Sequence, residues 1–464
     1  MNKYITTKVL LLALCIANAQ EKFDITKLAS TPPMGWNSFD AYDSRINEEE
    51  FKANVDVMAD ELLEYGFNIA TVDYLWFNPC SGCVKYPNKR FGHGNIRYAA
   101  DGGPIDTVTM DEYGRLLPSP NRFPSAANGK GFKEIADYVH SKGLKFGIHI
   151  MRGIHRQAVY FNTPILGTEY TARDIAKTYD SCTWSNHMYG VDASKPGAQE
   201  YYNSLFKMYA EWGVDFVKAD DMMVPPYHDG EIEMMWKAIQ NSGRPMLLSL
   251  SCGEAPISKA KHVSQHSHMW RISIDFWDEW EDIKRNFILL DAWSAFIGPN
   301  SWPDADMIPF GHISLNGRPR GPERQSLLTW DEHYTLMSLW CMARSPLIIG
   351  SDLLSSSDTS MSFFKNKEIL AINQNSYDNR QVYKNRKGHV CWIARIPDSE
   401  DVYIALFNTA DKDDKVGFNF EKEGLRGTYA VRDLWSKQEL GNFEQFISRE
   451  VRAHGAVVLR LSKQ

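Results

Sequence analysis

The chain has 464 residues, of which 43% are hydrophobic and 23% charged, a composition typical of a globular protein with enough apolar material for more than one domain. Its formal net charge is −7 at pH 7 and it contains no basic run, so nucleic acid is not expected as a partner. Beyond the first residues no apolar run is long enough to predict a membrane span. The oligomeric state stays open.

The first nineteen residues have the pattern of a signal peptide. Lys3 and Lys8 give a positive start, residues 9–17 form an apolar core, and Ala17-Asn18-Ala19 fits a small-x-small cleavage site. The apolar core is too short to cross a membrane. The sequence therefore predicts export, with a mature chain that is periplasmic or extracellular.

Six cysteines remain after this cleavage. A disulfide between Cys80 and Cys83 is possible in an exported protein. One C-x-x-C without a second pair or a nearby histidine is weak evidence for zinc, and no metal site is expected. The other four are expected to be buried thiols: Cys182, Cys252, Cys341 and Cys391.

Between residues 25 and 372, strand and helix patterns alternate. Helices are predicted after Asn47, whose side chain can cap the first of them, and over about 131–141 and 196–212. Gly66 is placed to end the first helix. Eight strand-like units are predicted at 33–40, 69–76, 145–151, 214–221, 245–252, 269–275, around 306, and 346–350. This alternation predicts an α/β fold, a (β/α)₈ TIM barrel.

After residue 372 the pattern changes to short alternating strands separated by charged turns. Such segments cover 381–395, 402–407, 415–420, 428–435 and 453–461. The sequence therefore predicts a C-terminal antiparallel β-sandwich domain over 380–464.

The stretch 214–221 carries the first candidate for chemistry. Lys218 and Asp220 are two residues apart, so in a strand they point to the same side. A neighbouring lysine keeps a carboxylate ionised, and the carboxyl ends of barrel strands face the substrate. Asp220 is thus a candidate nucleophile, with an ordinary structural ion pair as the alternative.

A second carboxyl group follows in the segment 270–275. A retaining glycosidase needs a nucleophile and a proton donor on two nearby carboxyl groups. Asp275, two predicted strands after Asp220, can lie at the same end of the barrel, and Arg271 can offer a donor fork to sugar hydroxyls. The alternative is that these charges belong to a surface loop.

Five motifs in order resemble glycoside hydrolase family 27, which contains α-galactosidases, α-N-acetylgalactosaminidases and some β-L-arabinopyranosidases. They are Pro33-Met34-Gly35-Trp36-Asn37, Val72-Asp73, Lys218-Ala219-Asp220, Trp270-Arg271 with Asp275, and Trp302-Pro303-Asp304-Ala305-Asp306-Met307. The resemblance runs from about residue 31 to the C-terminus. It implies a barrel followed by a β domain, and no metal or organic cofactor.

The resemblance also implies roles for individual residues. It places the nucleophile on Asp220 and the acid/base on Asp275, with retention of configuration. The residues that the family uses to contact the sugar fall on Trp36, Asp73, Lys218, Arg271 and Asp306.

The chain departs from the family pattern at several positions. Tyr74 stands where the family usually has a second aspartate, His149 where many members have tyrosine, and Cys252 is followed by Gly253 where the family often has Cys-Glu-Trp. Met222 replaces a cysteine. We expect Tyr74, His149 and Cys252 to face the sugar. The features at Tyr74 and 149–154 resemble a subgroup in which some members cleave β-L-arabinopyranosides.

The main functional prediction is a retaining exo-glycosidase that releases terminal α-D-galactosyl residues. A β-L-arabinopyranosidase with the same site and mechanism is the alternative, followed by an α-N-acetylgalactosaminidase or a catalytically lapsed carbohydrate-binding relative. Tyr74 motivates the first alternative, because it places an aromatic ring where a galactose hydroxymethyl group needs an acceptor. The expected partner is an oligo- or polysaccharide that contains galactose or L-arabinopyranose.

Overall fold

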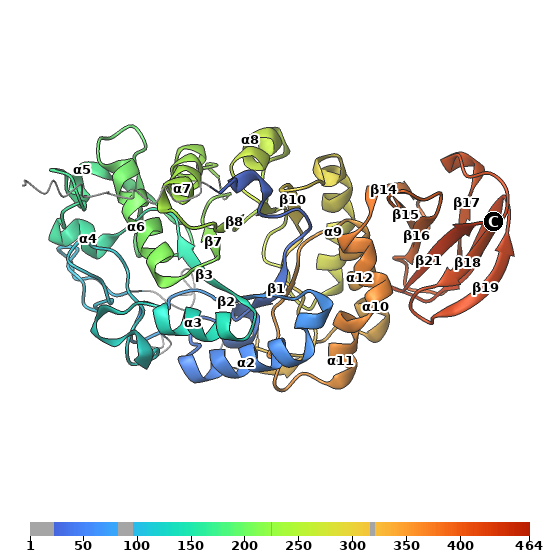
Figure 1. Ribbon diagram of the computed structural model, residues 1–464, viewed down its shortest axis with the longest axis horizontal. Helices are drawn as coiled ribbons and strands as arrows, with labels where there is room; N and C mark the ends of the chain where they lie inside the picture. Colours follow the sequence, from blue (N-terminus) through green and yellow to red (C-terminus); the bar gives the residue numbers. More distant parts are fainter. Residues whose placement is uncertain (1–22, 82–95, 224, 316–320) are drawn as a thin grey trace, which may run out of the picture.

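The computed structural model describes residues 23–81, 96–223, 225–315 and 321–464. The predicted signal peptide and Cys83 lie outside these residues, so the cleavage and the Cys80–Cys83 pairing stay predictions. No helix among the described residues is long and apolar enough to cross a membrane. Figure 1 shows a helix-rich body followed by a smaller all-β body at the C-terminal end.

Eight parallel strands form the central sheet, which confirms the predicted barrel class. In spatial order they are β10 (Trp302–Asp304), β9 (Met269–Arg271), β8 (Leu247–Leu250), β7 (Phe216–Asp220), β3 (Lys145–Met151), β2 (Ile69–Val72), β1 (Met34–Asn37) and β13 (Leu347–Ile349). Ile308, a few residues after β10, connects this first strand of the order to the last, β13. Its N–H donates to Ile348 O at 2.7 Å, and its carbonyl accepts from Gly350 N at 3.0 Å.

Helices surround this sheet (Figure 1). They include α1 (Phe39–Tyr42), α2 (Glu48–Glu61), α3 (Lys133–Ser141), α6 (Ala198–Trp212), α7 (Asp229–Ser242), α8 (Ala260–Gln265), α9 (Trp280–Trp293), α10 (Trp330–Met342), α11 (Asp358–Ser362) and α12 (Lys367–Gln374). Asn47 caps α2 in a reciprocal pair with Glu50, as its position predicts. Gly66 does not end α2 itself; it ends the short 3₁₀ turn Leu63–Tyr65, at a φ of 98°.

A small antiparallel sheet after β3 was not predicted from the sequence. It consists of β4 (Ile154–His155), β6 (Met188–Val191) and β5 (Ala176–Ser181), with α4 (Arg156–Phe161) and α5 (Ala172–Ile175) in between. Its strands are short and no residue of β5 is buried, so they lack the apolar run that marks a buried strand. This insertion stands beside the barrel mouth, because it grows directly out of the end of β3.

The C-terminal domain is an antiparallel sandwich, as predicted. Its strands are β14 (Tyr377–Lys384), β15 (His389–Arg395), β16 (Val402–Asn408), β17 (Asp414–Asn419), β18 (Tyr429–Asp433), β19 (Gln438–Phe443), β20 (Phe446–Val451) and β21 (Ala456–Lys463). The segment 381–395 is a hairpin rather than one strand. The sequence analysis also missed β19 and β20, whose residues are largely exposed and polar.

One hydrophobic core runs through both domains. Trp392 and Phe407 of the sandwich belong to the same buried cluster as Trp340 of α10. The rings of Phe287 in α9 and Phe407 in β16 meet edge to face, with centroids 5.0 Å apart. The sandwich is therefore packed against the barrel as part of one folded unit.

Candidate active site

The candidate residues collect at the carboxyl ends of neighbouring strands. β7 lies between β3 and β8, and its Lys218 is paired in register with His149 of β3. Asp220 is the last residue of β7 and is 8% exposed. Lys218 and Asp220 share one side of the strand, so both point toward the region where β3 also ends.

Asp220 is held by three groups. His149 Nε2 lies 2.9 Å from one carboxylate oxygen, the backbone N–H of Asp221 donates to the other at 2.7 Å, and the Cys252 thiol is also hydrogen-bonded to Asp220. Burial opposes ionisation, but the hydrogen bond from His149 and the charge of Lys218 outweigh it and bring the pKa of Asp220 well below its usual range. Asp220 is therefore an anion, which is the state that a nucleophile requires.

Lys218 does not pair with Asp220 directly but with Asp73 at the end of β2. The distance from Lys218 Nζ to the Asp73 carboxylate is 2.9 Å, and Asn37 donates to the same oxygen at 2.7 Å. Burial alone would raise the pKa of Asp73, yet Lys218 and Asn37 lower it. Asp73 is thus a fixed anionic acceptor, suited to bind sugar hydroxyls.

Arg271, Asp275 and Asp306 form a third group at the ends of β9 and β10. The Arg271 guanidinium lies 2.8 Å from Asp306 and 3.4 Å from Asp275. The side chains of Arg271 and Asp306 are each 3% exposed, whereas that of Asp275 is 50% exposed. Asp275 can therefore exchange a proton with solvent, as an acid/base group must.

Cys252 lies near the two carboxyl groups that the sequence predicts to act in catalysis. Burial raises the pKa of its thiol, and the negative charges of Asp220 and Asp275 raise it further. The thiol is therefore neutral and lies close to both groups. Cys182, Cys341 and Cys391 are buried as expected, whereas Cys252 is only partly buried.

Tyr74 is buried against aromatic neighbours beside the site. Its hydroxyl donates to Ser185 Oγ at 3.0 Å, and its ring meets His149 edge to face with centroids 5.4 Å apart. Trp184 and His187 complete the surroundings. Its hydroxyl is thus occupied by Ser185. Toward the site, Tyr74 presents an aromatic ring near His149, where the family usually has a carboxylate.

Trp36 has no accessible surface in this structure. Its indole N–H donates to Ser351 O at 2.8 Å, and its ring lies 5.8 Å from that of Phe51 in α2. These contacts fix the end of β1. The stacking of Trp36 on a sugar ring stays a prediction.

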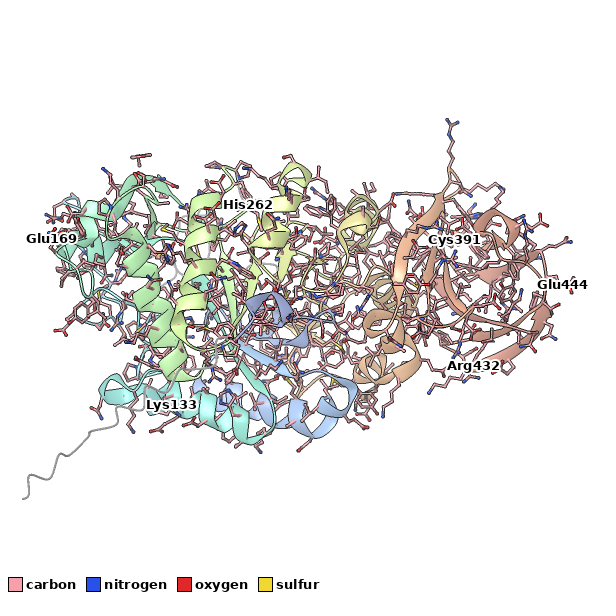
Figure 2. The ribbon with its side chains drawn as sticks, turned by 45° about the horizontal axis from the view of Figure 1, so that its top comes forward. Lys133, Glu169, His262, Cys391, Arg432 and Glu444 are labelled. Atoms are coloured by element: carbon pink, nitrogen blue, oxygen red, sulfur yellow. The ribbon has the colours of Figure 1, made fainter. Side chains whose placement is uncertain are left out.

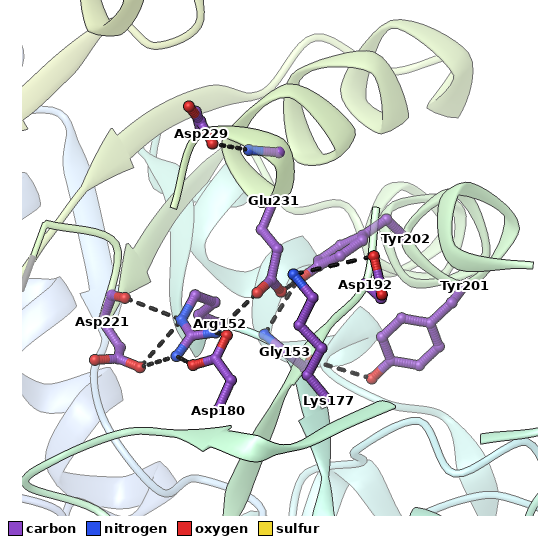
Figure 3. A network of polar contacts seen from close by, with 11 residues as sticks. Arg152, Gly153, Lys177, Asp180, Asp192, Tyr201, Tyr202, Asp221, Asp229 and Glu231 are labelled. Atoms are coloured by element: carbon purple, nitrogen blue, oxygen red, sulfur yellow. Dashed lines mark hydrogen bonds and ion pairs between the residues drawn. The ribbon is translucent and has the colours of Figure 1, made fainter. Parts of the chain in front are cut away.

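Arg152 was not singled out for a role from the sequence, although it lies in the unusual segment 149–154. Its buried guanidinium binds three carboxylates: Asp221 at 2.9 Å, Glu231 at 2.8 Å and Asp180 at 3.0 Å. Figure 3 shows this network, whose residues come from β5, from α7 and from the turns that follow β3 and β7. Arg152 N–H also donates to Asp220 O at 3.0 Å. The network thus holds the backbone on both sides of the candidate nucleophile.

Asp40 is a second residue that the sequence analysis did not assign. It lies on α1 directly after β1, it is 2% exposed, and its Oδ2 has no hydrogen-bond partner among the described residues. A Cβ at Gly350 would come within 2.0 Å of this oxygen, so Gly350 is needed to make room for it. Burial and the charge of Asp306 raise the pKa of Asp40 well above its usual range. It lies three residues after the first family motif and inside the predicted strand unit 33–40, and this proximity is the signal that could have found it.

Comparisons with known proteins agree with this architecture. The family model described as alpha galactosidase A matches residues 105–194 and 183–375, and the model of the alpha galactosidase C-terminal beta sandwich domain matches 387–461. Alpha-galactosidase A of Cellvibrio japonicus is 28% identical, covering 97% of this chain and 96% of the relative. Alpha-galactosidase 2 of Arabidopsis thaliana is 26% identical, with 94% and 91% covered.

Two solved structures are more similar in sequence. A family 27 β-L-arabinopyranosidase from Geobacillus stearothermophilus is 42% identical with a TM-score of 0.88, covering 95% of this chain and 98% of that one. A variant of that enzyme has been solved in complex with arabinose. A Bacillus halodurans structure assigned as an α-N-acetylgalactosaminidase is also 42% identical, with a TM-score of 0.81 and 93% and 97% covered.

The barrel, the sandwich and the matching family models define a glycoside hydrolase of the barrel class. The chain belongs to the alpha-galactosidase family, glycoside hydrolase family 27.

Proposed function

We propose that this chain is a retaining exo-glycosidase whose preferred substrate is a terminal β-L-arabinopyranoside. The observation that carries the proposal is the 42% identity, over 95% of the chain, to a family 27 β-L-arabinopyranosidase. The matched α-galactosidases lie at about 26%. α-Galactosidase activity, the main prediction from the sequence, becomes the second candidate, because α-D-galactose differs from this sugar by one hydroxymethyl group.

The proposed mechanism is a double displacement on two carboxyl groups. Asp220, kept ionised by His149 and Lys218, attacks the anomeric carbon while Asp275 donates a proton to the departing oxygen. Asp275 then acts as a base and activates the water that hydrolyses the glycosyl–enzyme intermediate. Two inversions at the same carbon retain its configuration.

Asp73, Lys218, Arg271 and Asp306 are proposed to bind the sugar hydroxyls. Each is buried or nearly so, and each is fixed by a charged partner. A fixed charged donor or acceptor binds a hydroxyl more strongly than a neutral one. Lys218, whose charge helps to keep Asp220 ionised, would thus also position the ring.

The preference for a sugar without a hydroxymethyl group is proposed to depend on Tyr74. Its hydroxyl is engaged by Ser185, so the ring leaves a hydroxymethyl group without the carboxylate acceptor usual in the family. A buried hydroxyl that loses its hydrogen bond costs about 1–3 kcal/mol, equivalent to roughly 5- to 150-fold in kcat/KM. This difference is large enough to set the specificity.

The test compares kcat/KM for nitrophenyl β-L-arabinopyranoside and nitrophenyl α-D-galactoside in the wild type, Tyr74→Asn, Tyr74→Asp and Tyr74→Phe. We expect the wild type to prefer the arabinopyranoside, and the Asn and Asp variants to shift the ratio toward the galactoside by about tenfold. Tyr74→Phe keeps the ring and should leave the ratio unchanged. Asp220→Asn serves as the inactive control for each substrate.

Several outcomes would count against the proposal. A wild type that prefers the galactoside is an α-galactosidase, and one that prefers nitrophenyl α-N-acetylgalactosaminide belongs with the Bacillus halodurans assignment. A ratio that does not move in Tyr74→Asn and Tyr74→Asp, when both variants unfold at the wild-type temperature, removes Tyr74 as the discriminating residue. No turnover of any of these substrates would indicate a lapsed, carbohydrate-binding relative.

A further inference from the structure

Three side chains with metal-binding atoms meet on the outer helical layer of the barrel. Glu233 is on α7, His262 is on α8, and His266 directly follows α8. One potential ligand atom from each lies within 4.8 Å of the others. Figure 2 labels His262 in this outer layer. None of the three belongs to the machinery proposed for glycoside cleavage.

Hydrogen bonds orient both imidazole rings. His266 Nδ1 lies 2.9 Å from the carbonyl oxygen of His262, and a carbonyl can only accept, so Nδ1 carries the proton and Nε2 is left with its lone pair. His262 Nδ1 lies 2.8 Å from the Tyr227 hydroxyl, while its Nε2 faces Glu233 at 3.1 Å. The Glu233 carboxylate can only accept a hydrogen bond, so His262 Nε2 carries a proton in the metal-free chain. A bound ion would displace that proton, and His262 Nδ1–H would then donate to the Tyr227 oxygen, the outer contact typical of metal-binding histidines.

The spacing of the histidines supports the same arrangement. Positions four residues apart lie on one face of a helix. Although His266 lies one residue beyond the end of α8, its ring centroid is 4.5 Å from that of His262, with an angle of 30° between their planes. Glu233 reaches this face from the neighbouring helix. A bound ion would therefore join α7 to α8.

The carboxylate of Glu233 is accessible to a cation from solvent. Its side chain is 57% exposed, and the ion pair that the structure gives it among the described residues is with His262. The nearby Lys259 pairs instead with Asp229 at 3.2 Å. A second cluster with suitable ligands, Asp180, His228 and Glu231, differs in this respect, because Arg152 already binds both of its carboxylates.

We propose that Glu233, His262 and His266 form a site for a divalent transition metal ion of the zinc class. Two imidazoles and one carboxylate suit zinc and its neighbours rather than magnesium or calcium, which prefer oxygen ligands alone. Three protein ligands at about 2.0–2.2 Å would leave a fourth tetrahedral position for water. The expected role is to clamp α7 against α8, outside the glycosidase reaction.

The experiment uses the full chain, stripped with EDTA and dialysed, and titrated with ZnCl₂ by calorimetry and by thermal unfolding. We expect one zinc ion per chain from this site and a rise in Tm on zinc addition. His266→Ala removes one ligand and should abolish the Tm rise on zinc addition. Because the variant also loses the bond from Nδ1 to His262 O, its zinc-induced change in Tm is compared with its own metal-free Tm. Tyr227→Phe should weaken zinc binding by about 10- to 100-fold, because it removes the contact that orients His262.

His228→Ala is the matched control, since it alters the second cluster and should leave zinc binding unchanged. Turnover of the nitrophenyl substrates should be the same for the wild type and His266→Ala, with or without zinc. The proposal is overturned if the wild type shows no stoichiometric zinc binding, or if His266→Ala and Glu233→Gln bind zinc as tightly as the wild type. A Co²⁺ spectrum with tetrahedral d–d bands in the wild type that is lost in His266→Ala would support it independently of stability.

Discussion

Two buried aspartates near the barrel mouth are driven in opposite directions by their surroundings. Asp220 and Asp40 are both almost inaccessible. Burial raises the pKa of both, but for Asp220 His149, Lys218 and Cys252 outweigh it and lower the pKa, whereas for Asp40 the charge of Asp306 adds to burial and its Oδ2 has no hydrogen-bond partner among the described residues. Burial alone thus does not decide the protonation state of a carboxyl group here; the donors around it do.

The role of Asp275 is testable through the leaving group. An acid catalyst matters most when the departing oxygen is a poor leaving group. Asp275→Ala should therefore lower kcat/KM for a natural disaccharide far more than for a nitrophenyl glycoside, by about 100-fold or more. Added azide should restore turnover of the nitrophenyl substrate and yield a glycosyl azide of retained configuration. Equal losses on both substrates without azide rescue would mean that Asp275 has another role.

Asp40 should make stability depend on pH in a predictable direction. Its raised pKa means that the folded state keeps a proton that the unfolded chain releases above about pH 4. The contribution of Asp40 to the free energy of unfolding therefore falls as the pH rises from about 4 toward its folded pKa. Asp40→Asn removes the titration. We expect the variant to be more stable than the wild type at pH 7, with a gain that shrinks toward pH 4.

Urea unfolding at pH 4, 5, 6 and 7 measures this difference. Asp398→Asn, at an exposed turn position, is the matched control and should give no pH-dependent gain. A gain for Asp40→Asn that is constant across the series, or a loss at pH 7, would contradict the assignment of a neutral Asp40.

At the scale of elements, Arg152 joins the end of β3 to the end of β7 by binding Asp221. Asp221 directly follows the candidate nucleophile and adopts a φ of 65°, a conformation that is costly for a residue other than glycine. Arg152 binds both the side chain and the carbonyl of Asp221, and Asp221 N–H donates to Asp220. The network thus maintains a strained turn that places a donor on the nucleophile.

Arg152→Lys tests this positioning role. Lysine keeps the charge but cannot form the planar fork that reaches three carboxylates. We expect kcat on the nitrophenyl substrate to fall by about tenfold with little change in KM, together with a loss of about 1–3 kcal/mol in the free energy of unfolding. Asp180→Asn, which alters the most exposed of the three carboxylates, should change stability less and leave kcat near the wild-type value. An unchanged kcat in Arg152→Lys would make the network purely structural.

At the scale of the whole molecule, barrel and sandwich should unfold together. Beyond the Phe287–Phe407 contact, Trp280 stacks on His454 with ring centroids 4.0 Å apart, and His454 Nδ1 lies 2.8 Å from Glu332 of α10. A continuous apolar interface of this kind couples the stability of its two sides.

Phe407→Ala should lower the stability of both domains at once. Removal of a fully buried phenylalanine costs about 3–5 kcal/mol of the free energy of unfolding. Unfolding is followed by enzyme activity, which depends on the barrel, and by β-sheet circular dichroism. We expect the midpoints of both transitions to shift to lower urea concentration by the same amount. Phe446→Ala, in the same domain but 54% exposed, is the control and should shift neither. Two separate transitions in the wild type would show instead that the domains fold independently.

The sequence by itself determined the features that depend on local pattern. Apolar runs marked most of the barrel strands, and the seventh was placed only within a few residues, around 306 rather than at Trp302–Asp304. Asn47 marked the start of α2, and the position of Asp220 at a strand end predicted its place at the mouth. These predictions succeed because a strand fixes the direction of alternate side chains, and a parallel barrel brings all strand ends to one face.

Only the tertiary structure decided which groups touch. His149 meets Asp220 across 71 residues, Arg152 reaches Glu231 across 79, and the small sheet β4–β6–β5 and the strands β19 and β20 carry no apolar run that marks them. The hydrophobic pattern shows only whether a segment buries one face. It does not mark strands that are exposed on both faces, and it does not show which distant residue a polar side chain contacts. The protonation of Asp40 and Asp220 depends on such distant partners, because burial and nearby charges, rather than residue type, set the pKa of a carboxyl group.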